Sequence, residues 1–181
     1  MKKLLLTSAG FENPAVRDCF LEMLAKPPAE ARALFIPTAA IDEEARAVLP
    51  KCMGDLLGAG LLPGHITTFD LDREMPPEEL AGYDAVCFCG GSTQHLLGRV
   101  KASGFDRALD LALDQGLVYV GVSAGSIIAA QNLPGNLGYL PRRLAVHCKA
   151  GAPPGPLPEG TVYLTNAQAV SLMGGEAEII G

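Results

Sequence analysis

The sequence predicts an α/β fold in which helices cover both faces of a mostly parallel β-sheet. Short apolar runs alternate along the chain with amphipathic stretches, which is the pattern of repeated βαβ units. The 181 residues are 49% apolar and 19% charged, a composition typical of one compact globular domain. We therefore expect a three-layer sandwich that forms a single domain over residues 1–181.

The first half of the chain supplies four predicted strands and two predicted helices. Asn13 and Pro14 give the first helix a start signal, with proline at its first position. Acidic residues from Asp42 to Glu44 begin the second helix, where the helix dipole favours negative charge, and this helix is expected to run to about Ala59. The strands are expected at residues 3–6, 33–36, 66–69 and 85–89.

The middle of the chain continues this alternation. A helical stretch follows Thr93 and another covers residues 105–115, before a fifth predicted strand at residues 117–120. Because strand–helix–strand crossovers are right-handed, such units build one parallel sheet that binds ligands at the carboxyl ends of its strands. Functional residues are therefore expected at strand ends.

The last part of the chain predicts a different local structure. Gly174 and Gly175 separate two runs with strand-like composition, residues 168–173 and 177–180. A glycine pair between two such runs is typical of a tight β-hairpin turn. We therefore expect a C-terminal β-hairpin.

Charge and composition exclude several classes of function. Fourteen basic residues against twenty acidic ones give a net charge of −6, which disfavours nucleic-acid binding. The apolar run at residues 4–6 is too short for a signal peptide or a membrane span, so we expect a soluble cytoplasmic protein. The five cysteines include no Cys-x-x-Cys pair, and no Walker-type phosphate loop occurs. We expect reduced thiols, no metal and no cofactor.

A Gly-x-Ser-x-Gly motif, residues 121–125, is the feature most specific for catalysis. It directly follows the predicted strand at 117–120 and precedes a helix-like segment, which is the setting of a nucleophile elbow. In such a turn Ser123 would be exposed as a nucleophile, and the N–H of Ala124 would face a developing oxyanion. The alternative is a turn of small residues that serves only packing.

A second strand end carries Gly90, Gly91 and Ser92. The amide of Gly90 or Gly91 could complete an oxyanion hole from a neighbouring strand, and Gly90 and Ser92 are also candidate substrate-binding residues. The alternative is a tight turn in which Ser92 or Thr93 caps the following helix.

A serine nucleophile needs a base, and the chain offers His65, His95 and His147. His147 is the best placed because it ends the apolar run at residues 143–147. Strand alternation would put Arg143 on the same face as His147. Arg143 or Lys149 could then hold an acidic substrate, unless this face is simply a solvated strand end.

The third member of a catalytic triad stays open. No Asp or Glu lies between Asp114 and Glu159. A carboxylate could reach His147 through the fold, an asparagine amide could orient a neutral imidazole, or a Ser–His dyad could act alone. The candidate acids are Glu159, Glu176 and Glu178, and the candidate amides are Asn132, Asn136 and Asn166.

Together these segments resemble the dipeptidase E family of serine peptidases, also called aspartyl dipeptidases. This family shares a class I glutamine-amidotransferase-like (flavodoxin-like) fold with the cyanophycinases. The resemblance implies that Ser123 is the nucleophile, that His147 is the catalytic histidine, and that Gly91 and Ala124 supply the oxyanion amides. The similar segments are residues 4–8, 35–39, 90–93, the turn at 123, the run ending at 147 and residues 164–169.

Three functions are weighed on this basis. The leading one is a metal-free serine hydrolase, a dipeptidase or small-peptide peptidase, that acts through an acyl-enzyme on Ser123 with His147 as base. The second is a non-catalytic binding or regulatory protein that keeps the fold without the chemistry. The third is a glutamine amidotransferase. By resemblance, that chemistry uses this fold with a cysteine at the elbow, where this chain has Ser123. Apolar sheet-edge and loop segments are compatible with a homodimer.

Overall fold

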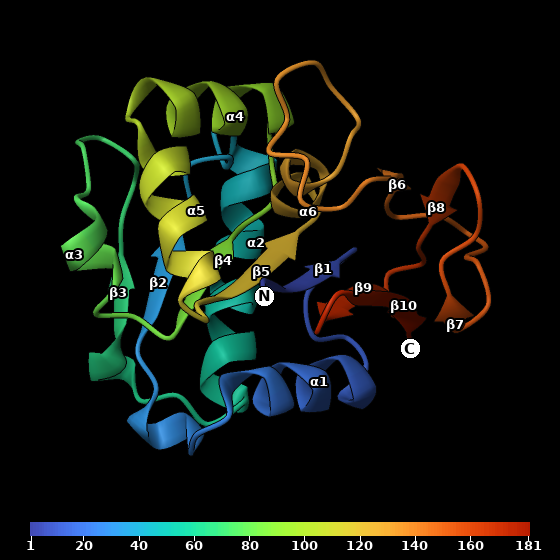
Figure 1. The fold of residues 1–181 in the computed structure, drawn as a ribbon, viewed down its shortest axis with the longest axis horizontal. Helices are drawn as coiled ribbons and strands as arrows, with labels where there is room; N and C mark the ends of the chain where they lie inside the picture. Colours follow the sequence, from blue (N-terminus) through green and yellow to red (C-terminus); the bar gives the residue numbers. More distant parts are fainter.

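A computed structural model describes all residues of the chain, 1–181. Its main sheet has eight strands in the order β3-β2-β4-β5-β1-β9-β10-β7 (Figure 1). These strands are β1 (Lys3–Thr7), β2 (Ala33–Ile36), β3 (Ile66–Thr68), β4 (Ala85–Phe88), β5 (Val118–Val122), β7 (Gly155–Pro156), β9 (Ala169–Met173) and β10 (Glu176–Ile180).

The five strands β1 to β5 are all parallel, as the alternating pattern predicts. Their register brings three strand ends together. Thr7 at the end of β1 lies beside Val122 of β5, and Phe88 at the end of β4 lies beside Gly121. The turns that follow β1, β4 and β5 are therefore neighbours at one edge of the sheet.

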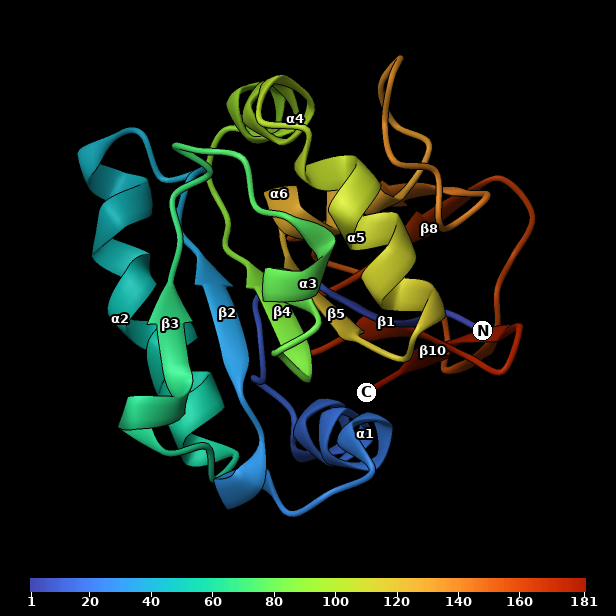
Figure 2. The ribbon, with the colours of Figure 1, turned by 60° about the vertical axis from the view of Figure 1, so that its left-hand side comes forward.

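Helices cover both faces of the sheet (Figure 2). They are α1 (Pro14–Leu24), α2 (Glu43–Gly58), α3 (Pro77–Leu80), α4 (Thr93–Ala102), α5 (Phe105–Asp114) and α6 (Ala124–Ala129), with short 3₁₀ turns η1 (Pro28–Glu30) and η2 (Pro63–His65). The hydrophobic residues of α1 and α2 form one core cluster with the sheet, and those of α3 to α6 form another. The predicted three-layer α/β fold is confirmed. No helix combines the length and the apolar character needed to cross a bilayer.

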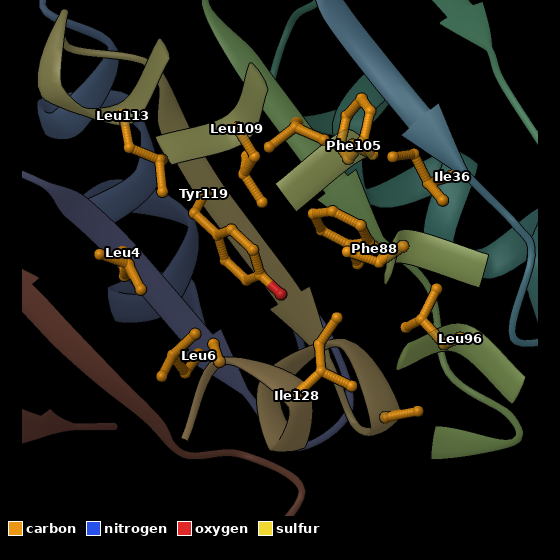
Figure 3. Packing of buried hydrophobic residues seen from close by; sticks show 14 of the residues in the cluster. Leu4, Leu6, Ile36, Phe88, Leu96, Phe105, Leu109, Leu113, Tyr119 and Ile128 are labelled. Atoms are coloured by element: carbon orange, nitrogen blue, oxygen red, sulfur yellow. The ribbon is translucent and has the colours of Figure 1, made fainter. Parts of the chain in front are cut away.

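The period-two alternation of β1 divides its leucines between the two cores. Leu4 and Leu6 lie in the larger cluster, and Leu5 lies in the smaller one. In the larger cluster the rings of Phe88 and Tyr119 stack with centroids 4.9 Å apart (Figure 3). The buried Tyr119 hydroxyl donates to the carbonyl oxygen of Gly125 at 2.6 Å, so the core fixes the turn after β5.

The C-terminal hairpin is confirmed and joins the main sheet. β9 and β10 pair in antiparallel fashion, and β9 pairs with β1. Gly174 and Gly175, with φ of 65° and 88°, form a two-residue turn that needs positive φ at both positions. The segment between α6 and β9 forms a separate parallel pair, β6 (Arg143–Ala145) and β8 (Thr161–Tyr163). β6 covers the first part of the strand expected at residues 143–147, whereas β8 and its pairing with β6 were not predicted.

Candidate active site

Ser123 occupies a strained turn between β5 and α6. Its φ of 50° and ψ of −105° lie outside the regions that a serine normally adopts, at a cost of about 1–3 kcal/mol. The N–H of Ser123 donates to the carbonyl oxygen of Thr7 at 3.1 Å, so β1 holds the turn in place. This is the local geometry of a nucleophile elbow.

Glycines around Ser123 allow this close packing. A Cβ on Gly121 would lie 2.7 Å from the carbonyl carbon of Gly125, and a Cβ on Gly125 would overlap the carbonyl oxygen of Phe88. On the other side, a Cβ on Gly90 would lie 3.3 Å from the Cβ of Ser123. The small residues of the motif are thus required by the turn and by the neighbouring strand.

We expect Gly125→Ala to lower the free energy of unfolding by about 2 kcal/mol, because the backbone of β4 must move to admit the methyl group. Gly98→Ala is the matched control: Gly98 lies inside α4, where a Cβ meets no atom within 4 Å. This change should stabilise the protein by about 0.5–1 kcal/mol. Urea unfolding measures the free energy of unfolding of both variants. Equal changes in this free energy would contradict the tight packing at Gly125.

The imidazole of His147 lies between Ser123 and an amide. Its Nε2 is 3.0 Å from the Ser123 Oγ, and its Nδ1 is 2.7 Å from the Asn166 Oδ1. An amide oxygen only accepts, so Nδ1 carries the proton and Nε2 presents its lone pair to the serine hydroxyl. His65 lies in η2 and His95 in α4, and neither lines the cleft at Ser123.

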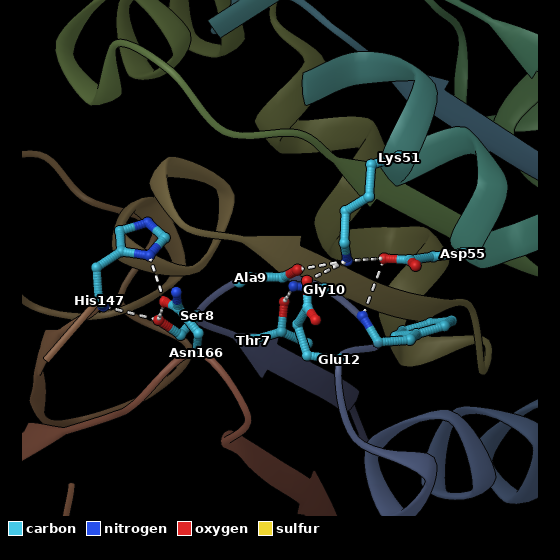
Figure 4. A network of polar contacts seen from close by, with 10 residues as sticks. Thr7, Ser8, Ala9, Gly10, Glu12, Lys51, Asp55, His147 and Asn166 are labelled. Carbon is cyan, nitrogen blue, oxygen red and sulfur yellow. Dashed lines mark hydrogen bonds and ion pairs between the residues drawn. The ribbon is translucent and has the colours of Figure 1, made fainter. Parts of the chain in front are cut away.

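Ser8 is a site residue that the sequence reasoning missed. It is fully buried at the end of β1, and its hydroxyl accepts the backbone N–H of His147 at 2.7 Å (Figure 4). This bond holds His147 in a left-handed conformation with φ of 57°. The signal available in the sequence was the position of Ser8, directly after a strand in the same sheet as the elbow.

The predicted strand at residues 143–147 is wrong beyond Ala145. β6 ends there, and His147 reaches Ser123 through the left-handed turn rather than by strand alternation. Arg143 and Lys149 are exposed and do not line the cleft, and their contact with a substrate stays a prediction.

Among the alternatives for the third member, the structure brings Asn166 to His147. Glu159 precedes β8 and Glu176 begins β10, and neither carboxylate makes a hydrogen bond or ion pair with the imidazole. Asn132 instead bonds the backbone of β6, and Asn136 bonds the carbonyl oxygen of Ile127.

Two backbone donors are available for an oxyanion. Gly91 has φ of 139°, and a Cβ there would overlap the carbonyl oxygen of Ala39, so only glycine fits. Its N–H donates to no protein group. Ala124 is the first residue of α6, and its N–H has no acceptor within the helix. Gly90 and Gly91 both line the cleft beside Ser123.

Ser92 has a structural role. It is the N-cap of α4, and its hydroxyl accepts the N–H of His95 at 3.2 Å. Its side chain does not line the cleft. The capping alternative is therefore confirmed, and a substrate contact by Ser92 stays a prediction.

The cleft at Ser123 has a volume of about 400 Å³, within the range of small-molecule sites. One wall is the loop between β1 and α1, the other is the first half of α2, and the ends of β4 and β5 lie between them. Figure 4 shows how Lys51 of α2 joins the two walls through a bond of 2.7 Å to the Ala9 carbonyl oxygen, while it also bonds Asp55 of its own helix at 2.8 Å. Asp55 in turn accepts the N–H of Phe11 at 2.9 Å.

A strained serine after a central strand, an imidazole bonded to it and two free N–H donors form the architecture of an α/β serine hydrolase. The family model described as "Peptidase family S51" matches residues 4–136. The chain belongs to this family of serine-type peptidases. The match includes Ser123 and ends before His147 and Asn166.

Known relatives agree with the family and the fold. An "Uncharacterized peptidase PM1590" from Pasteurella multocida (strain Pm70) is 27% identical over 133 residues, which are 74% of this chain and 62% of that protein. The chain thus spans less than two thirds of this curated relative. A crystal structure described as a putative peptidase E protein from Listeria monocytogenes EGD-e superposes with a TM-score of 0.77 at 23% identity, covering 99% of this chain and 98% of that one. A peptidase from an acI-B1 Actinobacterium gives 0.72 at 16% identity, covering 100% and 88%.

Proposed function

We propose that this protein is a serine peptidase that hydrolyses dipeptides or other short peptides through an acyl-enzyme on Ser123. One observation carries the proposal: a single imidazole lies 3.0 Å from the Ser123 hydroxyl and 2.7 Å from the Asn166 amide. Membership of peptidase family S51 supports the reaction class. The limited volume of the cleft favours a short substrate.

In the first half of the reaction, the Ser123 Oγ attacks the scissile carbonyl carbon while its proton passes to His147 Nε2. The N–H groups of Gly91 and Ala124 stabilise the negative oxygen of the tetrahedral intermediate. The carbon–nitrogen bond then breaks, and the imidazolium gives its proton to the leaving amine. An acyl ester on Ser123 remains.

In the second half, a water molecule loses a proton to His147 and attacks the ester. The second tetrahedral intermediate collapses as the imidazolium returns the proton to the Ser123 oxygen, which restores the enzyme. Asn166 keeps the Nδ1 proton in place throughout, and the bond from Ser8 to the His147 N–H keeps the ring over the serine.

A fluorophosphonate probe with intact-mass detection tests this function. We expect one probe per wild-type molecule and none on Ser123→Ala or His147→Ala. Ser103→Ala is the control, because this hydroxyl bonds backbone oxygens at the end of α4, away from the cleft. Absence of labelling on folded wild-type protein would contradict the proposal and favour a non-catalytic binding protein.

A further inference from the structure

The charged residues of the catalytic cleft are mostly acidic. Those that line it are Glu12 of the β1–α1 loop and Asp42, Glu44 and Lys51 of the α2 wall. Asp55 lies directly behind Lys51. Four carboxylates thus accompany one ammonium group. The N-terminus of α2 adds only about half a positive charge, which leaves the cleft negative.

Lys51, the only cation that lines the cleft, is fully engaged by the protein. Its ammonium group contacts the Ala9 carbonyl oxygen at 2.7 Å, Asp55 at 2.8 Å and Glu12 at 3.2 Å. Burial alone would lower the pKa of Lys51, but hydrogen bonds and charges from Asp55 and Glu12 outweigh burial and raise it. An ammonium group has three donors, so none remains for a substrate carboxylate.

The carboxylates, in contrast, keep free acceptor capacity toward the cleft. Glu44 is exposed and makes no hydrogen bond or ion pair with the protein. Asp42 uses Oδ1 to accept the Ala45 N–H at 2.8 Å and leaves Oδ2 unbonded. Asp42 and Glu44 line the same cavity as Ser123 and His147, so a peptide bound in this cavity meets their negative charge.

We propose that this cleft selects peptides with a basic side chain next to the scissile bond and rejects peptides with an acidic one. The inference rests on the proposed function, because it takes the cleft to be where the substrate binds. A lysine or arginine side chain pairs with Glu44 and Asp42, whereas an aspartate side chain meets like charge and finds no free cation. Arg143 and Lys149 lie outside the cleft and do not change this balance.

Matched peptides test the charge preference. The values of kcat/KM are compared for lysyl-alanine and Nε-acetyl-lysyl-alanine, and for aspartyl-alanine and asparaginyl-alanine, with the reversed dipeptides to test the other side of the bond. We expect kcat/KM for lysyl-alanine to exceed that for Nε-acetyl-lysyl-alanine by about 5-fold. We expect kcat/KM for aspartyl-alanine to be lower than that for asparaginyl-alanine. The preference should weaken as ionic strength rises from about 0.01 M to about 1 M. Faster cleavage of the acidic peptides in both orders would overturn the inference.

Two matched variants of α2 test whether the preference for basic peptides arises from carboxylates that line the cleft. Glu44→Gln should lower kcat/KM for the basic peptide by about 3-fold and lower it less for the acetylated peptide. Glu43→Gln removes the same charge from the same helical turn, but Glu43 does not line the cleft, so its effect should be smaller. Equal effects of the two changes would contradict recognition by Glu44.

Binding to the Ser123→Ala protein separates this inference from the proposed function. Calorimetric titration of that variant with lysyl-alanine and aspartyl-alanine measures recognition without chemistry. Tighter binding of the basic peptide supports the charge preference even if wild-type protein takes no fluorophosphonate. Probe labelling together with tighter binding of the acidic peptide would keep the peptidase and overturn the preference.

Discussion

Replacing either Ser123 or His147 with alanine is expected to lower kcat/KM for peptide hydrolysis by at least about 10⁴-fold, and replacing both should lower it no further than the larger single loss. The reason is the contact of 3.0 Å between the imidazole Nε2 and the Ser123 Oγ. The base has no function without the hydroxyl it deprotonates, and the hydroxyl is a weak nucleophile without the base. The two side chains therefore act as one unit.

Initial rates with a dipeptide substrate, for the wild type, both single variants and the double variant, measure this coupling. Ser103→Ala serves as the control, because it removes a serine hydroxyl outside the cleft. Thermal unfolding of every variant checks that the fold is intact. Losses that add in the double variant, or a Ser123→Ala protein that keeps its rate, would show that these residues do not share one reaction.

Ser123 could be predicted because its signal is local in sequence. Glycines two residues on either side, an apolar strand before and a helix after are all visible within about a dozen residues. The structure places Ser123 in the expected turn, with β5 ending at Val122 and α6 beginning at Ala124. The parallel order of β1 to β5 follows from the same kind of local alternation.

His147 was predicted for a reason that proved wrong. The run ending at His147 has the alternation of a strand, but β6 stops at Ala145, and the backbone then turns with a positive φ. That conformation is held by the buried hydroxyl of Ser8, which lies 139 positions earlier in the chain. A contact between such distant positions leaves no trace in local periodicity.

Asn166, the residue that bonds the His147 imidazole, reaches the site because the C-terminal hairpin adds strands to the parallel sheet. Asn166 precedes β9, and β9 reaches the site because it pairs with the free edge of β1. The terminal hairpin was predicted, but its attachment to β1 was not, so Asn166 stayed one of several candidates. The same unpredicted attachment of the hairpin left Glu176 open, and Glu159 lies in the irregular segment after α6, whose course local patterns do not predict.

We expect Asn166→Ala to lower kcat by about 10²-fold or more with a much smaller change in KM. The change removes the acceptor 2.7 Å from His147 Nδ1, so the imidazole can rotate and can place its proton on Nε2, where it cannot accept the serine proton. Steady-state kinetics separate the two constants. Asn13→Ala is the control, because this amide caps α1 and does not line the cleft, and its loss should cost about 1 kcal/mol of stability without changing kcat.

Asn166→Asp distinguishes positioning of the imidazole from a structural role of the amide. A carboxylate at the same place still accepts the Nδ1 proton and also stabilises the imidazolium that forms during attack, so this variant should keep far more activity than Asn166→Ala. The same charge favours the protonated imidazole in the free enzyme, so the acid limb of the pH–rate profile should move to higher pH. If the Asn166 amide only holds residues 164–168 in place, Asn166→Ala and Asn166→Asp should lose equal amounts of kcat. The acid limb of the pH–rate profile should then stay where it is in the wild type.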